Sequence, residues 1–408
     1  MRMFAKIFGP IEVTNSLKLL ILIGGLYSLS IALSNSYVNV FLWKQSNQML
    51  DIALYNLAIA FIQPFAFIVA GKVAKKIDRI VVLRLGVIIL SLFFVSVLAF
   101  GSNGTSEVIF FGFLLGAGYG FYWLAYNVLT FEITEPETRD FFNGFLGIMM
   151  SLSGMIGPFV SGIVISSFES FTGYTVIFFV SLALFLCAVV LSFFLERRSS
   201  KGTFMLEMVY RETKVNRNWR NVLFAHFFQG LREGIFAFVV IVFVYIATNS
   251  EMAVGTFSLL MSFTQFIMYY LVSRFVSEKH RKTAILFGGI ILYLSIYIIL
   301  FQLTYFALLI YAVVISIAYP LLLVPYQSIT YDVIGKSRKA AEMRVEYIVF
   351  REVFLNVGRM VSILVFIICI SIFREESIRY VMMILGAGHL ILYFFIRNVS
   401  FNELKAIS

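Results

Sequence analysis

Arg232 and Glu233 stand side by side near the middle of a strongly apolar stretch, within HFFQGLREGIF (226–236). A charge at the centre of a bilayer costs about 2.5–3.5 kcal/mol on insertion scales, so both side chains should face water or a partner. Neighbours on a helix point about 100° apart, so these two are poorly placed to pair with each other. His226 and Glu233 share one helical face, with Gln229 at its edge. This face is therefore predicted to be hydrated.

A second charged group occurs in the apolar stretch EYIVFREVFLNVGRMVS (346–362). Glu352, Asn356 and Arg359 fall on one helical stripe at spacings of four and seven, and Arg351 lies beside them. Two arrangements are possible. Either Glu352 and Asn356 hold Arg359 in place through contacts within this segment, or the segment supplies a charged partner to the segment that contains Glu233.

These groups could bind and release protons. A coupling carboxylate must gain and lose its proton as its surroundings change from one side of the membrane to the other. Glu233 and Glu352 are the buried acids that qualify, with His226 as a possible relay. A fixed structural salt bridge between the two segments is the alternative. Arg232, Arg351 and Arg359 against two acids leave a net positive lining, which favours an anionic group on a ligand.

The elements that must hold these residues are membrane helices. Of the 408 residues, 61% are hydrophobic and 13% charged, about half the charge of soluble domains. Runs of about 20 apolar residues are needed to cross a bilayer, and helices satisfy their backbone groups there. We find twelve such runs: 17–42, 51–71, 80–100, 107–131, 142–167, 173–195, 221–248, 252–273, 283–303, 305–331, 346–373 and 377–397. The sequence therefore predicts an all-α integral membrane protein.

The basic residues indicate the orientation. With a cytoplasmic N-terminus, the inner segments hold 26 of the 32 Lys and Arg, and the outer loops hold Lys44, Arg374 and Arg379. This bias predicts a multi-pass protein of the cell membrane with both termini in the cytoplasm. The net charge of +10 is then explained by topology and by contact with anionic lipids, and no nucleic acid is expected as a partner.

The chain divides into two related halves. A basic segment at 196–220 separates a predicted six-helix bundle, 1–195, from a second one, 221–408. At an offset of 200 residues, YGFYWLAYNVLTFEI (119–133) matches YPLLLVPYQSITYDV (319–333), with polar positions aligned. Such repetition indicates duplication of one unit.

The repeated segments also carry aromatic and amide side chains at helical spacing. Aromatic rings with polar tips suit a large amphipathic ligand, although packing is the more usual role of such stripes. The residues predicted to face a cavity from these segments and from the first helix are Tyr119, Tyr122, Trp123, Tyr126, Asn127, Tyr319, Tyr326, Gln327, Tyr27 and Asn35.

Two loops resemble a signature of the major facilitator superfamily, in which Gly, any residue, Leu, Ala, Asp and Arg are followed by any residue, Gly, Arg and Lys. In GKVAKKIDRI (71–80) the fitting positions are Gly71, Val73, Ala74, Lys76 and Arg79, and in SRFVSEKHRK (273–282) they are Arg281 and Lys282. Lys75 replaces the acid, Asp78 the second glycine and Ile80 the lysine. The family's acid takes part in a charge lock on the outward-facing state, so we do not transfer this lock. We expect Gly71, Asp78, Arg79 and Arg281 to act in conformational gating.

The fifth predicted helix resembles the glycine motif of antiporters in this superfamily. Gly144, Gly157, Pro158 and Gly162 fit, and Ser153 and Ser161 replace two glycines. Small residues and a proline produce a smooth, bent helix that packs closely on a neighbour and can rock on it. Gly157 and Pro158 are expected to serve this movement, and a proline kink with ordinary small-residue packing is the alternative.

The resemblance covers essentially the whole chain and implies two pseudo-symmetric six-helix bundles around a central cavity, lined by helices 1, 4, 7 and 10 and reached alternately from each side. It implies a secondary transporter that moves a small molecule, and we expect proton coupling, with antiport or export of an amphipathic, anionic solute. The alternatives are a flippase for an anionic lipid or lipid-linked cell-envelope precursor, and a non-transporting scaffold or sensor for a partner enzyme.

Enzymatic chemistry is not expected. The two cysteines stand singly in apolar helices, and the chain contains no GxxxxGK[ST] phosphate loop. We therefore predict no metal, no cofactor and no enzymatic activity, and we expect a monomer in contact with membrane lipids.

Overall fold

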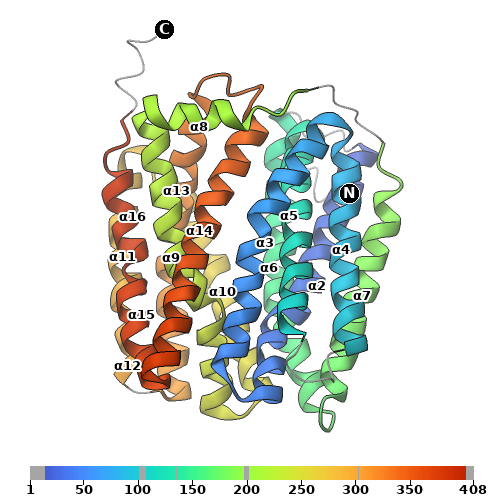
Figure 1. Cartoon of the computed structure of the whole chain (residues 1–408), viewed down its shortest axis with the longest axis vertical. Helices are drawn as coiled ribbons and strands as arrows, with labels where there is room; N and C mark the ends of the chain where they lie inside the picture. Colours follow the sequence, from blue (N-terminus) through green and yellow to red (C-terminus); the bar gives the residue numbers. More distant parts are fainter. Residues whose placement is uncertain (1–13, 101–106, 134–135, 197–201, 302, 401–408) are drawn as a thin grey trace.

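The chain folds into a bundle of long helices that run roughly parallel to one axis (Figure 1). The computed structural model describes residues 14–100, 107–133, 136–196, 202–301 and 303–400, and their side chains except those of 131–145. Within these ranges the regular structure is α-helix with short 3₁₀ turns. The prediction of an all-α membrane fold is confirmed.

The N-terminal half, as we call the first six long helices, precedes the basic segment at 196–220. Its helices are α2 (Asn15–Ser46), α3 (Met49–Lys76), α4 (Arg79–Phe100), α5 (Val108–Ile133), α6 (Pro136–Ser166) and α7 (Thr172–Ser192).

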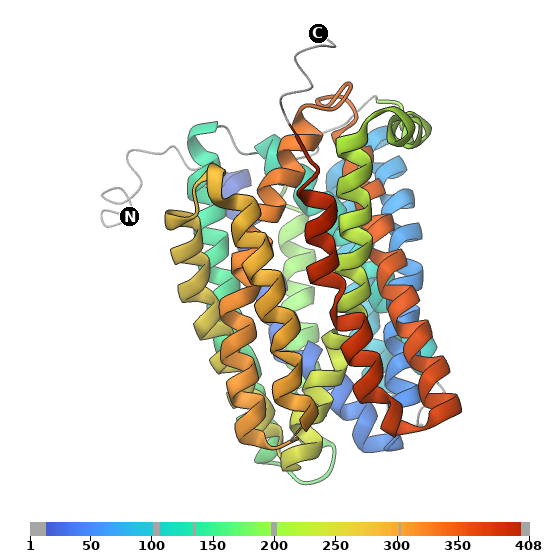
Figure 2. The ribbon, with the colours of Figure 1, turned by 90° about the vertical axis from the view of Figure 1, so that its left-hand side faces the viewer.

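The C-terminal half follows a short amphipathic helix, α8 (Leu206–Val215). Figure 1 shows α8 lying across one end of the bundle, and Figure 2 shows it end on. We call this end of the molecule the linker end. The helices of the C-terminal half are α9 (Arg217–Thr248), α10 (Glu251–Phe275), α11 (Arg281–Leu294), α12 (Ile296–Phe301), α13 (Tyr305–Gly335), α14 (Arg344–Phe373), α15 (Ile378–Gly386) and α16 (Gly388–Ile396).

Twelve spans in the described part of the chain are long and apolar enough to cross a membrane, and they coincide with the twelve predicted runs. Two of them are interrupted. The ninth span breaks between α11 and α12 at Ser295, and the twelfth breaks between α15 and α16 at Ala387. Hydropathy does not detect such breaks, because the residues around them are as apolar as the helices.

Corresponding corners of the two halves are built alike. Asn47 ends α2 and Asn249 ends α9, both in the left-handed conformation (φ 53° and 47°) that asparagine tolerates well. Each helix is joined to the next by a turn of two residues. The equivalent geometry agrees with the repetition seen in the sequence.

Glycines allow the tightest helix packing in the N-terminal half. Gly112, Gly116 and Gly120 of α5 all lie directly against α3, where a side chain at any of them would collide with that helix. Small residues at every fourth position of α5 therefore allow the two helices to pack closely.

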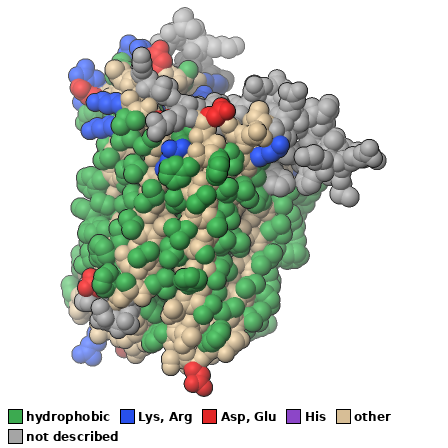
Figure 3. Space-filling view, turned by 90° about the vertical axis from the view of Figure 1, so that its right-hand side faces the viewer, with side chains coloured by type: hydrophobic (Ala, Val, Ile, Leu, Met, Phe, Trp, Pro, Cys, Tyr) green, Lys and Arg blue, Asp and Glu red, His purple; other side chains and the backbone are tan. Residues whose placement is uncertain are grey.

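The halves meet along two pairs of helices, α3 with α14 and α6 with α10. On the face shown in Figure 3, hydrophobic side chains cover the flank, and most of the visible Lys and Arg side chains gather at the linker end. A flank of this kind suits a lipid environment.

Candidate functional site

A cavity of about 890 Å³ lies between the two halves. Its wall is formed by α2, α3 and α5 on one side and by α9, α10, α13 and α14 on the other, with Leu292 of α11. The helices expected to line a cavity, the first, fourth, seventh and tenth, are α2, α5, α9 and α13. The second, eighth and eleventh also contribute, and the eleventh, α14, carries three of the charged groups.

Twelve of the predicted coupling and binding residues lie in this wall: Asn35, Tyr119, Trp123, Asn127, Arg232, Glu233, Tyr319, Gln327, Arg351, Glu352, Asn356 and Arg359. The other six, described below, are not among the lining residues.

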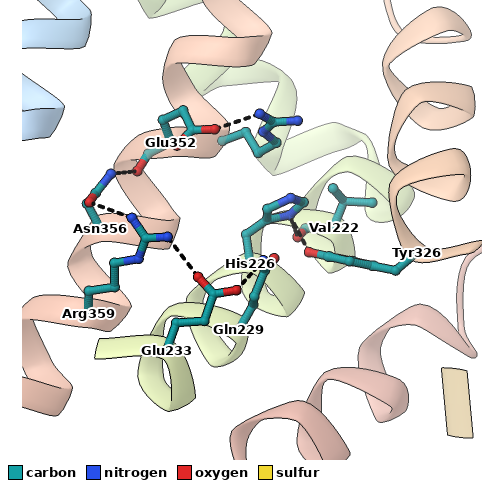
Figure 4. A network of polar contacts seen from close by, with 9 residues as sticks. Val222, His226, Gln229, Glu233, Tyr326, Glu352, Asn356 and Arg359 are labelled. Carbon is teal, nitrogen blue, oxygen red and sulfur yellow. Dashed lines mark hydrogen bonds and ion pairs between the residues drawn. The ribbon is translucent and has the colours of Figure 1, made fainter. Parts of the chain in front are cut away.

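The carboxylate of Glu233 joins three helices, and Figure 4 shows its contacts with Arg359 and Gln229. It accepts a charge-assisted hydrogen bond of 2.7 Å from the guanidinium of Arg359 on α14 and one of 3.1 Å from the hydroxyl of Tyr319 on α13. The amide of Gln229, one turn earlier on α9, donates at 2.8 Å. The side chains of Glu233 and Arg359 keep 16% and 29% exposure, so the pair is open to the cavity rather than sealed.

The second acid pairs within its own helix. Arg351 donates to the adjacent Glu352 at 2.6 Å, so these neighbours turn toward each other despite the angle between them. Asn356 donates to the backbone carbonyl of Glu352 and accepts from Arg359 at 3.4 Å. The second arrangement considered from the sequence is therefore seen, because α14 supplies Arg359 to Glu233. Of the first arrangement only one part is seen, since Asn356 contacts Arg359 whereas Glu352 pairs with Arg351.

Arg232 is the unmatched cation of the site. Its residue is 5% exposed, and no carboxylate of the described chain pairs with its guanidinium, whose Nε and Nη2 have no hydrogen-bond partner. The guanidinium lies over the ring of Phe236, 4.5 Å from its centroid, and the phenol of Tyr311 is its polar neighbour. Arg232 and Glu233 do not pair, as their spacing predicted.

His226 lies behind the wall. Its Nδ1 is 2.8 Å from the carbonyl oxygen of Val222 and 2.5 Å from the hydroxyl of Tyr326, and the residue is 1% exposed. Nε2 of His226 and Oε1 of Gln229 have no hydrogen-bond partner in the described part of the chain, although Gln229 donates to Glu233. The role of His226 as a relay stays a prediction.

Three predicted aromatic residues pack inside the N-terminal half. Tyr27 stacks on Tyr122, with ring centroids 3.8 Å apart and planes within 5°. Tyr126 stacks on Tyr122 and donates to the carbonyl of Leu20. All three are almost fully buried, so they support the wall through Trp123 and do not form it.

The sequence analysis did not identify a set of carboxamides in the wall: Asn39, Asn56, Gln63 and Gln265. Asn56 donates to Asn39 at 2.9 Å, and Tyr119 donates to Asn35 at 3.3 Å. These residues could have been predicted from the sequence. Uncharged amides are also costly in lipid, and spacings of four (35 and 39) and seven (56 and 63) place them on one face of a membrane helix.

At the linker end the halves are joined by an ion pair. The ammonium of Lys75 lies 3.2 Å from the carboxylate of Glu346 and donates to the carbonyl of Glu342. Gly71 lies against Phe204, which precedes α8. Lys75, which replaces the acid of the family signature, thus has a partner of opposite charge in the other half.

Asp78 and Arg281, two further predicted gating residues at this end, each have a contact within their own half. The buried Asp78 accepts from the backbone N–H of Ile80 at 2.7 Å, at the start of α4, where Arg79 is the first residue. Arg281 pairs with Asp332 at 2.9 Å, which ties α11 to α13.

At the opposite end, α6 packs on α2 and α10. Gly157 lies against Ala32 of α2, and the carbonyl of Pro158 accepts from the hydroxyl of Tyr37 at 2.7 Å. Lys44 of α2 pairs with Glu251 of α10 at 2.7 Å, which is a second ion pair between the halves.

Within the described residues, no group of three His, Cys, Asp or Glu is placed to hold a metal ion.

Comparison with known proteins gives relatives along the whole chain. A sequence profile of the Major Facilitator Superfamily matches residues 19–341. The uncharacterized protein YqgE of Bacillus subtilis (strain 168) is 56% identical over 399 residues, 98% of this chain and 93% of that protein. An uncharacterized protein encoded in the sodM 3′ region of Geobacillus stearothermophilus is 51% identical over 214 residues, 52% of this chain and 100% of that protein.

Two solved structures have the same fold. The human organic anion transporter MFSD10 (TETRAN) superposes with a TM-score of 0.68 at 12% identity and covers 93% of this chain and 98% of its own. The Escherichia coli fucose:proton symporter FucP superposes with a TM-score of 0.63 at 15% identity. The superposition covers 93% of this chain and 97% of the symporter. At these identities the likeness is one of fold.

Proposed function

The chain belongs to the major facilitator superfamily, and on this premise we propose that it is a proton-coupled secondary transporter of an amphipathic organic anion. Alternating access suits a cavity that lies between two halves and is bounded by an ion pair between them at each end. Its substrate would be a small molecule, as in the transporters that share the fold.

The unmatched Arg232 carries the proposal of an anionic substrate. The wall contains three guanidinium groups and two carboxylates, and each carboxylate already has an arginine of its own. A buried cation without a counter-ion is costly. Because Nε and Nη2 of Arg232 are buried, a carboxylate or phosphate from a ligand would supply that counter-ion once the side chain turns from Phe236 into the cavity. Aromatic and aliphatic residues such as Trp123, Tyr319 and Met261 would contact the less polar part of the ligand.

Proton coupling follows from the pair between Glu233 and Arg359. Protonation of Glu233 removes its charge, so Arg359 joins Arg232 as a second cation without a counter-ion, and the affinity of the cavity for an anion rises. By linkage, a bound anion favours protonation of Glu233 to the same extent. The other polar groups near this carboxylate are Tyr319, Gln229, His226, His389 and Tyr269.

Mutual stabilisation of proton and anion favours movement of both in the same direction. The glycine motif of α6 favours exchange instead, so the two hypotheses predict opposite responses to a pH gradient. The positive bias of the segments at the linker end supports a cytoplasmic location of this end in the cell membrane, with both termini inside.

The experiment uses purified protein in proteoliposomes. A thermal-shift screen of organic anions first supplies an anion that binds, and proton flux driven by this anion is then followed with a pH-sensitive dye inside the vesicles. We expect anion-dependent proton flux in the wild type and its loss in Glu233→Gln, with anion binding retained. Glu207→Gln is the matched control, because this carboxylate is 74% exposed on α8.

Three results would contradict the proposal. Anion transport without proton movement would remove the coupling. Scrambling of fluorescent anionic lipids between leaflets, without flux of soluble anions, would indicate a flippase. Absence of both activities together with stable capture of a partner enzyme would indicate a scaffold or sensor.

A further inference from the structure

Four carboxamides in the cavity wall have no hydrogen-bond partner within the part of the chain that the structure describes. Gln63 of α3, Asn127 of α5, Gln265 of α10 and Gln327 of α13 all line the cavity. The described residues contain no hydrogen bond to any of these four side chains, although the remaining amides of the wall are bonded. Their polar atoms are also absent from the buried groups that lack partners, so these atoms face open space.

The free amides surround the space rather than cluster at one point. Two belong to the N-terminal half and two to the C-terminal half, on four different helices. In contrast, Asn35, Asn39 and Asn56 are fixed by hydrogen bonds to Tyr119 and to each other. The wall therefore combines oriented amides with amides that are free to bind a ligand.

The chemistry of the carboxamide narrows the class of ligand. Each amide offers donors on nitrogen and an acceptor on oxygen, and a hydroxyl group is likewise both donor and acceptor. An anion with only alkyl or aromatic groups would displace water from four amides and leave them without partners, which weakens binding. A ligand with several hydroxyls satisfies them. Tyr119 and Trp123 offer ring faces for its C–H surface.

We propose that the cavity binds a hydroxylated organic anion of the sugar-acid or sugar-phosphate type, with its anionic group on Arg232 and its hydroxyls on Gln63, Asn127, Gln265 and Gln327. This inference rests on the proposed function and specifies its substrate. The same chemistry occurs in free solutes and in the head groups of glycosylated or inositol lipids, and the experiment separates these two sources.

Binding to the purified full-length protein is measured by calorimetry. The probes are glucuronate and glucose 6-phosphate, cyclohexanecarboxylate as an anion of similar size without hydroxyls, and glucose as the neutral counterpart. We expect at least one hydroxylated anion to bind about 10-fold or more tightly than both cyclohexanecarboxylate and glucose.

Variants of single amides test whether these side chains cause the preference for hydroxylated anions. Gln63→Leu and Gln327→Leu should each weaken binding of the hydroxylated anion by about 10-fold, and binding of cyclohexanecarboxylate should be unchanged or tighter, because one amide fewer is left without a partner. Gln48→Leu is the matched control, since Gln48 is exposed at the end of the bundle opposite to α8. Size-exclusion chromatography and the retained affinity for cyclohexanecarboxylate show that each variant is folded.

The lipid source is tested in nanodiscs. If phosphatidylinositol raises the melting temperature more than phosphatidic acid does, the ligand is a lipid with a hydroxylated head group. If glucuronate or glucose 6-phosphate binds tightly, the ligand is a soluble solute. Equal affinity for hydroxylated and hydroxyl-free anions overturns this inference and leaves anion transport intact. Binding of no anion in either format overturns the proposed function as well.

Discussion

The ammonium of Lys75 lies 3.2 Å from the carboxylate of Glu346, and this pair connects the last turn of α3 to the first turn of α14. Both side chains are almost inaccessible, with 10% and 0% exposure. The backbone N–H of Met205, just before α8, donates to the same carboxylate. The closure at the linker end thus unites both halves with the segment that joins them.

Removal of one member of this pair should open the linker end. Breaking a buried ion pair leaves a charge without compensation and costs about 3–5 kcal/mol. Lys75→Met and Glu346→Gln should both lower the melting temperature and expose a cysteine placed at Asn39, in the wall, to a water-soluble maleimide added from that end. Lys72→Met, at an exposed lysine of the same helix, is the control.

The reversed pair provides the stricter test. The double variant Lys75→Glu/Glu346→Lys should recover most of the lost stability and closure, because it restores opposite charges at the same positions. If the double variant is no better than the single ones, the lysine acts through packing alone.

The opposite end should respond to Glu251 in the same way. This carboxylate pairs with Lys44 and accepts a hydrogen bond of 3.0 Å from the hydroxyl of Tyr174. Glu251→Gln should raise labelling of a cysteine placed at Asn39, in the wall, by a reagent added to the side of the membrane opposite to the linker. Unchanged labelling would assign the pair to stability only, and Glu376→Gln, exposed at the same end, controls for surface charge.

Substitution of Arg232 and substitution of Arg359 should change the stability of the ligand-free protein in opposite directions. Arg232→Gln removes a buried guanidinium that lacks a counter-ion, so we expect a higher melting temperature, by roughly 1 kcal/mol or more of unfolding free energy. Arg359→Gln leaves Glu233 without its cation and should destabilise by about 3 kcal/mol. Thermal unfolding of the two variants side by side tests this. A loss of stability in both would mean that Arg232 has a stabilising partner.

Much of the fold was predictable from the sequence, because chain length and hydropathy determine where a helix can cross a bilayer. The positions of the buried charges were predictable for the same reason. Their pairing was not, since the choice of partner depends on how neighbouring helices are rotated. Arg351 turned to its neighbour Glu352, and Arg359 crossed to Glu233.

Four amides of the wall, Asn39, Asn56, Gln63 and Gln265, were not predicted, for a different reason. Hydropathy ranks ionised groups as the most costly in lipid, so it singles out arginines and glutamates before uncharged amides. Tyr27, Tyr122 and Tyr126 show the converse error, since aromatic spacing alone does not distinguish a cavity wall from the layer of packing behind it.

Close packing of α9 on α14 sets the geometry of the Glu233–Arg359 pair. Gly230 and Gly358 face the other helix at this crossing, and a Cβ at Gly358 would collide with the carbonyl oxygen of Phe227. Gly358→Ala should therefore separate the helices, lower the stability by about 2 kcal/mol and impair proton-coupled flux. Gly147→Ala, where a Cβ meets open space, should be neutral or stabilising by up to about 1 kcal/mol. Melting temperatures and flux measured on both variants decide the question, and equal behaviour would show that the crossing tolerates a wider spacing without loss of the pair.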